Sequence, residues 1–218
     1  MKKKFIDTNI VNKSKTVEDK IQLYKHNEQM LPLPTEIEIS ESGTCNRTCS
    51  FCPRSAPDFE DKKEFISDFL HNKLCLELKE LNYTGTIRYS GFVEPLLDKN
   101  IYNLIRMVRT NLPNSNIELV TNGDPLNLKR LNKLFENGLN KILISAYDGK
   151  EDADKLENLC KTANLKKDQY IVRHRYYSED QDFGITLSNR AGLMEQAEYK
   201  IQGLKEPMKN PCYIPSYT

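Results

Sequence analysis

The chain has 218 residues, of which 38% are hydrophobic and 29% are charged, and this length and composition are typical of one α/β domain with a sizeable core. Its 32 basic and 31 acidic side chains give a net charge of +1, so no general electrostatic attraction to nucleic acid is expected. No apolar run approaches the roughly 18 residues that a membrane span needs, and no apolar signal core follows the basic N-terminus. We therefore expect a cytoplasmic protein without membrane or nucleic-acid partners.

Strand-like and helix-like patterns alternate along the chain. Residues before 35, including "VEDKIQLYKHNEQMLPLP", are polar and are interpreted as a helix on the exterior, with Pro32 and Pro34 as a linker. Period-two and period-3.6 patterns then predict, in chain order, a strand at 35–40, a helix at 61–82, a strand at 86–91, a helix at 97–113, a strand at 117–123, a helix at 126–140 that ends near Gly138, a strand at 141–149, a helix at 151–163 and a strand at 168–177.

The first predicted helix, 61–82, spaces apolar residues as an amphipathic helix does. We expect its buried stripe to contain Phe65, Phe69, Leu76 and Leu81. Two cysteines, one in this helix and one in the helix at 151–163, are interpreted as ordinary buried thiols; they are Cys75 and Cys160.

A strand–helix series of this length predicts a parallel sheet with right-handed crossovers. In such a sheet, reactive groups lie on loops beyond the carboxyl ends of the strands. Polar stretches follow four successive predicted strands: a cysteine-rich loop, "GFVEP", "TNGDP" and "SAYDG". The sequence therefore predicts one functional edge of the sheet.

The loop "TCNRTCSFCPR", residues 44–54, contains Cys45, Cys49 and Cys52, three of the six cysteines in the chain. A reducing compartment makes structural disulfides improbable and leaves metal binding or redox chemistry as reasons for the cluster. A zinc site usually needs four ligands in two pairs, and no second pair is present. Three thiolates on a cubane iron–sulfur cluster leave one iron without a protein ligand. The spacing favours such a cluster, with zinc and unligated thiols as alternatives.

The spacing C-x3-C-x2-C after a first strand, with Phe51 directly before the last cysteine, resembles the signature of the radical S-adenosylmethionine (SAM) superfamily. The resemblance implies an α/β fold, a partial (β/α)6-type barrel, over residues 35–190. It also implies that Cys45, Cys49 and Cys52 hold a [4Fe–4S] cluster, that SAM binds its open iron and is split to a 5′-deoxyadenosyl radical, and that Phe51 lies near the adenine. A reductase or a flavodoxin- or ferredoxin-type protein is the expected electron donor.

Further SAM contacts follow from the resemblance. "YSGFVEPLL", residues 89–97, resembles the Gly-Glu-Pro loop whose acceptors receive the SAM ammonium. This match assigns Gly91 and Glu94 to SAM binding. Val93 stands where glycine is common in the family, so the local turn is expected to differ.

Three later positions are assigned to the cofactor in the same way. Asn122 lies in "TNGDPL" and supports the pocket, and Ser145 in "SAYDG" approaches SAM. Arg173 on the last predicted strand matches arginines that fork onto the SAM carboxylate, with Arg175 as its rival. Asp148 is interpreted as the cap of the following helix.

The C-terminal stretches 183–193 and 210–218 resemble the end of the barrel and the start of a SPASM or twitch extension, which binds auxiliary clusters. Pro211, Cys212 and Pro215 carry the second resemblance. One cysteine cannot hold a cluster, so we consider a fragment, a lost extension or ligands from a partner.

The sequence thus predicts an N-terminal polar segment at 1–34, a radical SAM partial barrel at 35–190 and a C-terminal segment at 191–218. The predicted function is radical modification of a substrate by reductive SAM cleavage, with a peptide as the first expectation because of the SPASM-like tail. A sugar or nucleotide metabolite is the alternative substrate. A non-catalytic iron–sulfur electron-transfer module and a zinc-binding module are the alternatives from other classes.

Overall fold

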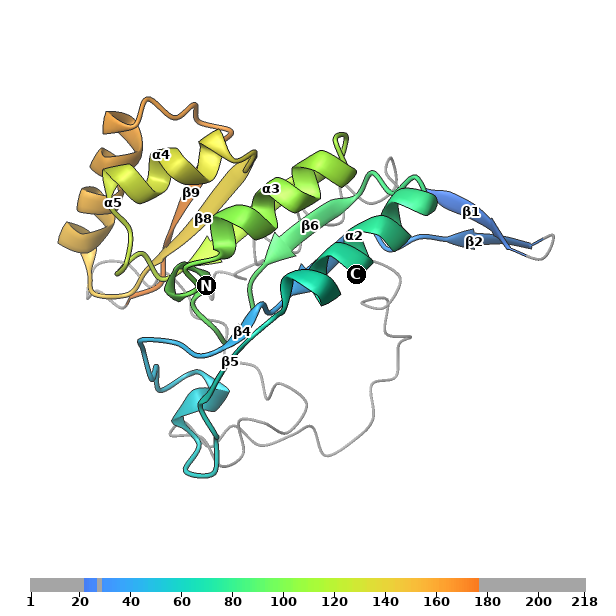
Figure 1. The fold of residues 1–218 in the computed structure, drawn as a ribbon. Helices are drawn as coiled ribbons and strands as arrows, with labels where there is room; N and C mark the ends of the chain where they lie inside the picture. The colour runs from blue at the N-terminus through green and yellow to red at the C-terminus, as the bar shows by residue number, and fades with distance from the viewer. Residues whose placement is uncertain (1–21, 27–28, 177–218) are drawn as a thin grey trace, which may run out of the picture.

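The computed structural model describes residues 22–26 and 29–176. Its centre is a five-stranded sheet in the order β3-β6-β7-β8-β9, and every neighbouring pair is parallel (Figure 1). The strands are β3 (Glu36–Ile39), β6 (Thr86–Tyr89), β7 (Asn116–Thr121), β8 (Lys141–Ala146) and β9 (Tyr170–His174). Strand order follows chain order, which is the topology of a partial barrel. The predicted α/β fold is confirmed, and the predicted barrel end at 183–193 lies outside the described residues.

Helices cover one face of this sheet (Figure 1). They are α2 (Asp68–Glu80), α3 (Ile101–Asn111), α4 (Leu128–Glu136) and α5 (Lys150–Thr162). Strand side chains alternate between the two faces, so Ile87, Ile117 and Ile142 share the helix-covered face and are fully buried. Leu104 and Leu131 pack into the same core. Each such side chain contributes about 1.5–3 kcal/mol of burial free energy, which fixes the positions of the strand ends.

The opposite face of the sheet carries several charged and polar side chains, with apolar ones such as Leu143 among them. Arg88 on β6 forms ion pairs with Glu36 on β3 and with Glu118 on β7, the second at 2.6 Å. Ser145 lies on this face too, because Glu118 pairs with Lys141 and Ser145 comes four residues later on the same strand; Arg173 is the register partner of Ser145 on β9. Polar side chains of this face therefore lie at the carboxyl ends of β8 and β9.

The N-terminal segment differs from its prediction. Residues in the predicted exterior helix form an antiparallel hairpin of β1 (Leu23–His26) and β2 (Gln29–Pro32), with Leu23 opposite Pro32. Pro32 ends a strand here, where its missing N–H costs no ladder hydrogen bond, and is not a free linker. The hairpin extends away from the parallel sheet (Figure 1). The prediction of a helix was wrong over residues 23–26 and 29–32, because these residues pair with each other as two antiparallel strands; residues 1–21 lie outside the described part.

The helix predicted at 61–82 is shorter in the structure, and it buries a different face from the one predicted. Residues Lys62–Phe65 form β5, which pairs with β4 (Ser42–Gly43), and α2 begins only after its cap at Ser67, whose Oγ accepts a hydrogen bond from Leu70 N at 3.2 Å. The side chain of Phe69 is 81% exposed, so the predicted buried stripe was wrong.

The buried face of α2 carries His71, Cys75 and Leu78 instead. His71 Nε2 shares a hydrogen bond of 2.8 Å with the hydroxyl of buried Tyr89. His71 is therefore a buried polar residue whose hydrogen bond is satisfied inside the core. A search for apolar periodicity does not detect such a residue. The thiols of Cys75 and Cys160 lie in the core as predicted.

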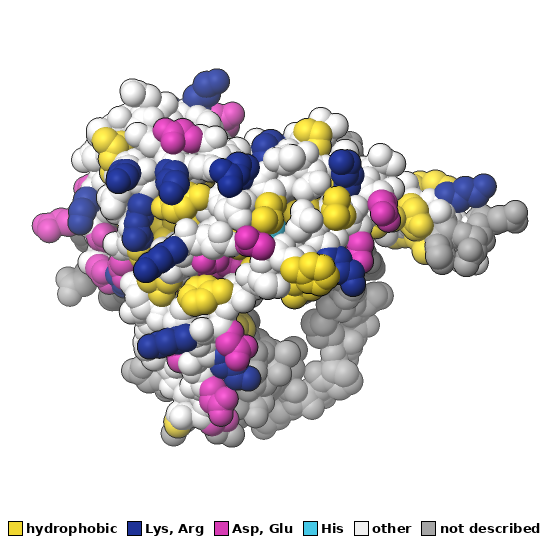
Figure 2. Space-filling view, in the orientation of Figure 1, with side chains coloured by type: hydrophobic (Ala, Val, Ile, Leu, Met, Phe, Trp, Pro, Cys, Tyr) yellow, Lys and Arg dark blue, Asp and Glu magenta, His cyan; other side chains and the backbone are white. Residues whose placement is uncertain are grey.

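The remaining elements agree with the predictions apart from their ends. A short 3₁₀ turn, η2 (Pro95–Leu97), precedes α3, and Gly138 ends the α4 region with φ of +106°. Figure 2 shows hydrophobic side chains scattered among charged ones on one face of the molecule. In the described ranges, no helix has the length and apolarity needed to cross a membrane.

Candidate radical SAM site

The cysteine loop is a tight turn held against two neighbouring segments. It follows β3, and Cys52 N donates to Cys49 O at 2.9 Å. The 3₁₀ turn η1 (Pro53–Ser55) comes directly after Cys52. The guanidinium of Arg54 donates to the carbonyl oxygens of Gly43 and Phe92, at 3.3 and 3.1 Å, so it ties this turn to the loop after β6.

The three thiols of the loop are half-buried, and Cys45 and Cys52 lie close enough to Cys49 to act on it electrostatically. Burial, followed by the nearby Cys52, raises the pKa of Cys49 to about 11. Within residues 22–26 and 29–176, no three His, Cys, Asp or Glu side chains converge on a point where they could hold one metal ion. Each thiolate on a cubane cluster binds a different iron, and three thiolates on one loop are a donor set that such a cluster takes.

The other described thiols, Cys75 and Cys160, lie in the core of α2 and α5 and not beside this loop. Cys212 lies outside the described residues. Within the described part, the loop thus offers three thiolates and no fourth one nearby, and a fully protein-ligated electron-transfer cluster has no support there.

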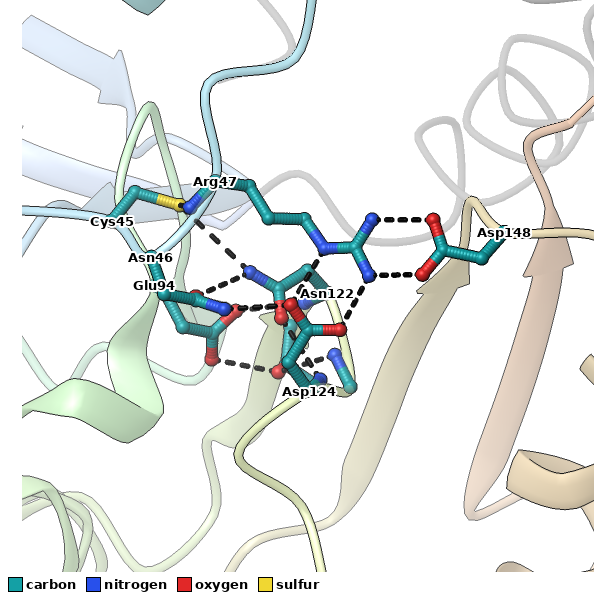
Figure 3. Close-up of polar contacts among 9 residues, drawn as sticks. Cys45, Asn46, Arg47, Glu94, Asn122, Asp124 and Asp148 are labelled. Atoms are coloured by element: carbon teal, nitrogen blue, oxygen red, sulfur yellow. Dashed lines mark hydrogen bonds and ion pairs between the residues drawn. The ribbon is translucent and has the colours of Figure 1, made fainter. Parts of the chain in front are cut away.

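Glu94, which follows β6, is almost completely buried and joins two strand ends (Figure 3). Its Oε1 accepts hydrogen bonds from Thr121 Oγ1 at 2.7 Å and Leu96 N at 3.1 Å, and its Oε2 accepts from Asn122 N at 2.7 Å. Burial raises the pKa of this carboxyl. A carboxylate has about four acceptor sites, so three are used and one is left for a ligand.

Gly91 is needed at its position. Its φ is +127°, and a Cβ added there would lie 2.1 Å from Ser40 Oγ. Val93, which replaces a glycine common in this motif, is not among the positive-φ residues of the described part. The loop therefore keeps one glycine where the backbone requires it and tolerates valine two residues later.

Asn122 connects the end of β7 to the cysteine loop (Figure 3). Its Nδ2 donates to Asn46 Oδ1 at 2.8 Å and lies 3.8 Å from Cys45 Sγ. Its Oδ1 accepts from Asp124 N at 3.0 Å, which fixes the amide orientation. Asn122 is therefore placed to donate a hydrogen bond to a thiolate ligand.

A second polar group lies at the ends of β8 and β9. Arg173 Nη2 donates to buried Ser145 Oγ at 2.9 Å. Tyr147 follows Ser145, and its ring centroid lies 5.3 Å from that of Phe51 in the cysteine loop. Burial raises the pKa of Tyr147. The rings make an aromatic wall beside Cys49, and of the two candidate arginines it is Arg173 that donates to Ser145.

Sequence reasoning missed the side chain that bridges the loops. Arg47 pairs with both Asp124 and Asp148 at 2.5 Å (Figure 3). The prediction that Asp148 caps α5 was wrong, because Gly149 is the cap residue and the Asp148 carboxylate turns to Arg47 instead. Only the shared edge of the predicted loops pointed to this contact.

A buried carboxyl also lies under the site. Glu41, between β3 and β4, is 1% exposed, and burial raises its pKa from 4.5 to about 8. Asp98 and Glu94 are close enough to raise it further. In the described part, Glu41 Oε2 and Asp98 Oδ2 are buried without a hydrogen-bond partner.

The carboxyl edge of the parallel sheet carries three thiols, the buried side chains of Glu94 and Ser145, and an aromatic wall. In α/β barrels the active site lies at this edge. The family model of the radical SAM superfamily matches residues 39–177 of the chain. The chain therefore belongs to the radical SAM superfamily, whose members use a [4Fe–4S] cluster and SAM.

Two curated relatives and one solved structure illustrate the similarity. The S-adenosyl-L-methionine-dependent 2-deoxy-scyllo-inosamine dehydrogenase of Niallia circulans is 30% identical over 181 residues, which are 83% of this chain and 66% of the relative. A GTP 3′,8-cyclase of Mesorhizobium japonicum is 28% identical over 134 residues, which are 60% of this chain and 39% of the relative.

The crystal structure of BtrN in complex with AdoMet and 2-DOIA has 28% identity and a TM-score of 0.61, and it aligns with 75% of this chain and 63% of its own. The chain thus spans at most about two thirds of the length of these relatives.

Proposed function

We propose that this protein is a radical SAM enzyme that abstracts a hydrogen atom from a polar small molecule. The supporting observation is the half-buried trio Cys45, Cys49 and Cys52 at the same sheet edge as the predicted SAM contacts. When bound and reduced, the cluster supplies the electron that breaks the S–C5′ bond of SAM, giving methionine and a 5′-deoxyadenosyl radical that takes the hydrogen atom.

The chain's own residues bind and orient the cofactor. Cys45, Cys49 and Cys52 are the proposed cluster ligands, and Asn122 supports Cys45 with its amide. Glu94 keeps one acceptor site for the SAM ammonium while its other three hydrogen bonds hold the loops together. Because this carboxylate is buried, a hydrogen bond from a cation there is stronger than one in water.

The nucleoside side of the proposed site is aromatic and basic. Phe51 and Tyr147 offer ring faces for the adenine. Arg173, held by Ser145, presents its guanidinium to the SAM carboxylate. Gly91 keeps the loop backbone in the conformation that leaves room beside Ser40.

The substrate class rests on two supports. The relatives named above are a dehydrogenase of 2-deoxy-scyllo-inosamine and a GTP cyclase, both named for small polar molecules. The sheet face opposite the helices carries the polar residues Ser145 and Arg173 at its carboxyl edge. We therefore favour a hydroxylated or amino-bearing metabolite. The peptide expectation stays a prediction, because the tail that motivated it lies outside the described residues, as do the predicted SPASM-like segment and its Cys212.

The remaining partners and the compartment are part of the same proposal. Reduction of the cluster needs a one-electron donor, for which we propose a flavodoxin- or ferredoxin-type protein or its reductase. A cytoplasmic location follows from the reduced state that three metal-binding thiols require.

The test uses the full chain, reconstituted with iron and sulfide without oxygen. We expect the visible absorption of an iron–sulfur cluster and, with a strong reductant and SAM, the formation of 5′-deoxyadenosine. With a candidate deuterated aminocyclitol or sugar, deuterium should then be recovered in 5′-deoxyadenosine. Absence of SAM cleavage by iron-loaded protein would refute the enzyme assignment. Cleavage with no deuterium transfer from any polar metabolite, but with transfer from a peptide, would refute the substrate class alone.

A further inference from the structure

Arg47 lies between the first two cysteines of the loop and makes more ionic contacts than any other side chain drawn at the site (Figure 3). One edge of its guanidinium forks onto Asp124, with Nε to Oδ2 at 2.7 Å and Nη2 to Oδ1 at 2.5 Å. The other edge forks onto Asp148, with Nη1 to Oδ1 at 2.8 Å and Nη2 to Oδ2 at 2.5 Å. Planar, two-edged pairing of this kind is specific to arginine, because a lysine ammonium cannot fork.

The two partners come from different strand ends. Asp124 follows β7, and Asp148 follows β8. Asn46, the neighbour of Arg47, donates a further hydrogen bond to Asp124 Oδ2 at 2.6 Å. Arg47 therefore fastens the Cys45–Cys49 segment to two separate loops at once.

The face of the guanidinium has a third contact. Its carbon lies 5.6 Å from the centroid of the Tyr147 ring, and that ring packs against Phe51. Tyr147 is the residue directly before Asp148. The same side chain therefore holds the cysteine segment and one half of the aromatic wall in a fixed relative position.

From this geometry we infer that Arg47 is a positioning residue that sets the cluster ligands and the aromatic wall in register with each other. This inference rests on the proposed function, since it concerns the same cluster. Arg47 is not a cluster ligand and need not touch SAM. Its effect passes through the orientation of the cysteine segment and of Tyr147, because a loop with little regular structure otherwise relies on few contacts to keep its ligands in place.

The ion pairs of Arg47 with Asp124 and Asp148 are partly exposed to water, so their strength depends on their geometry. The Arg47 side chain is 20% exposed, whereas those of Asp124 and Asp148 are 36% and 58% exposed. An isolated pair this exposed would contribute little. Two forks on one guanidinium, with an aromatic ring on its face, form a network instead, and its strength should fall with rising salt.

The test compares Arg47→Lys and Arg47→Met with Arg88→Lys. Arg88 is a matched control because it also bridges two carboxylates, Glu36 and Glu118, but all three residues lie within strands and not on the loops at the carboxyl edge. The measured quantities are the rate of iron release to a chelator from reconstituted protein and the Kd of SAM for the oxidised, non-reacting cluster. Both Arg47 variants should release iron on the order of tenfold faster and bind SAM more weakly, as disturbed supporting contacts do in other metal sites. Arg88→Lys should match wild type in both.

A further measurement tests the same inference without reference to the cluster, and a further variant keeps the test valid if the Arg47 variants do not fold. Hydrogen–deuterium exchange of the full chain should speed up over residues 44–52 and 145–149 in Arg47→Lys, and not in Arg88→Lys. Asp148→Asn, a change at an exposed partner, should give a smaller change in the same direction, and it decides the question if the Arg47 variants do not fold.

The outcomes separate the two claims. Equal iron release and equal SAM affinity in wild type and all these site variants would overturn the role of Arg47 while leaving the enzyme assignment intact. Equally fast iron loss from Arg88→Lys would also overturn it, because the effect would then be general instability. A wild-type protein that binds no cluster would instead refute the proposed function.

Discussion

Replacement of Glu41 by glutamine should make the protein more stable, by an amount that grows with pH. Glu41 is 1% exposed, and burial raises its pKa from 4.5 to about 8, with Asp98 and Glu94 adding to the shift. The folded state therefore holds this proton at pH values where the unfolded state has lost it. By linkage, the free energy of unfolding of the wild type falls as pH rises from about 4.5 to about 8 and is level above that range.

The size of the effect follows from the same two values. Each pH unit between them corresponds to about 1.4 kcal/mol, so the wild type should lose on the order of 2 to 3 kcal/mol from this group between pH 5 and pH 7. Glutamine cannot ionise and avoids that loss. The difference in unfolding free energy between Glu41→Gln and wild type should therefore widen by roughly this amount over the same interval.

The assay is urea unfolding of the full chain at pH 5, 6, 7 and 8. Glu38→Gln serves as the control, because Glu38 is an exposed carboxylate on the adjoining strand. A difference between Glu41→Gln and wild type that stays constant with pH would show that the reasoning about burial is wrong. An equal widening for Glu38→Gln would show that it is not specific to Glu41.

Two further predictions concern the loops of the site. Gly91→Ala should lower the free energy of unfolding by more than about 1 kcal/mol, because its φ is +127° and the new Cβ would lie 2.1 Å from Ser40 Oγ. Gly149→Ala, which has a φ of +113° but nothing within 4 Å of the new Cβ, should lower it less in the same denaturation assay. Equal losses in the two variants would argue against the clash with Ser40. Tyr147→Phe should keep the ring contact with Phe51 and a near-normal affinity for SAM. Tyr147→Ala should weaken SAM binding by roughly 2- to 12-fold, the equivalent of about 0.5–1.5 kcal/mol. An unchanged SAM affinity in Tyr147→Ala would show that the aromatic wall of Phe51 and Tyr147 takes no part in SAM binding.

The sheet edge could be predicted from the sequence because polar motifs followed strongly apolar strands. The stretch that forms β8 is the most apolar of the strand-like patterns and is buried along nearly its whole length, so its position was clear, and the loops after such strands had to meet at one edge. The contact of Asn122 with Cys45, and that of Arg173 with Ser145, agree with that expectation.

The parts that failed depend on partners that are distant in sequence. The short strand β5 forms only because Ser42 and Gly43 pair with it, and nothing in "KKEF" itself shows that partner. Asp148 was interpreted from its local position before a helix, whereas Arg47, about a hundred residues earlier, determines its actual orientation. Local patterns therefore identified the elements, and long-range charge pairing decided how their side chains are used.

We propose that Cys45, Cys49 and Cys52 hold a cluster at which SAM is split. The most direct measurement is iron content together with 5′-deoxyadenosine formation in oxygen-free, reconstituted Cys49→Ala, with Cys75→Ala as the control, because Cys75 is a buried core thiol in α2. Cys49→Ala should lose bound iron and SAM cleavage together, while Cys75→Ala keeps both. Normal SAM cleavage by Cys49→Ala, or a zinc-containing wild type that cleaves none, would contradict the account.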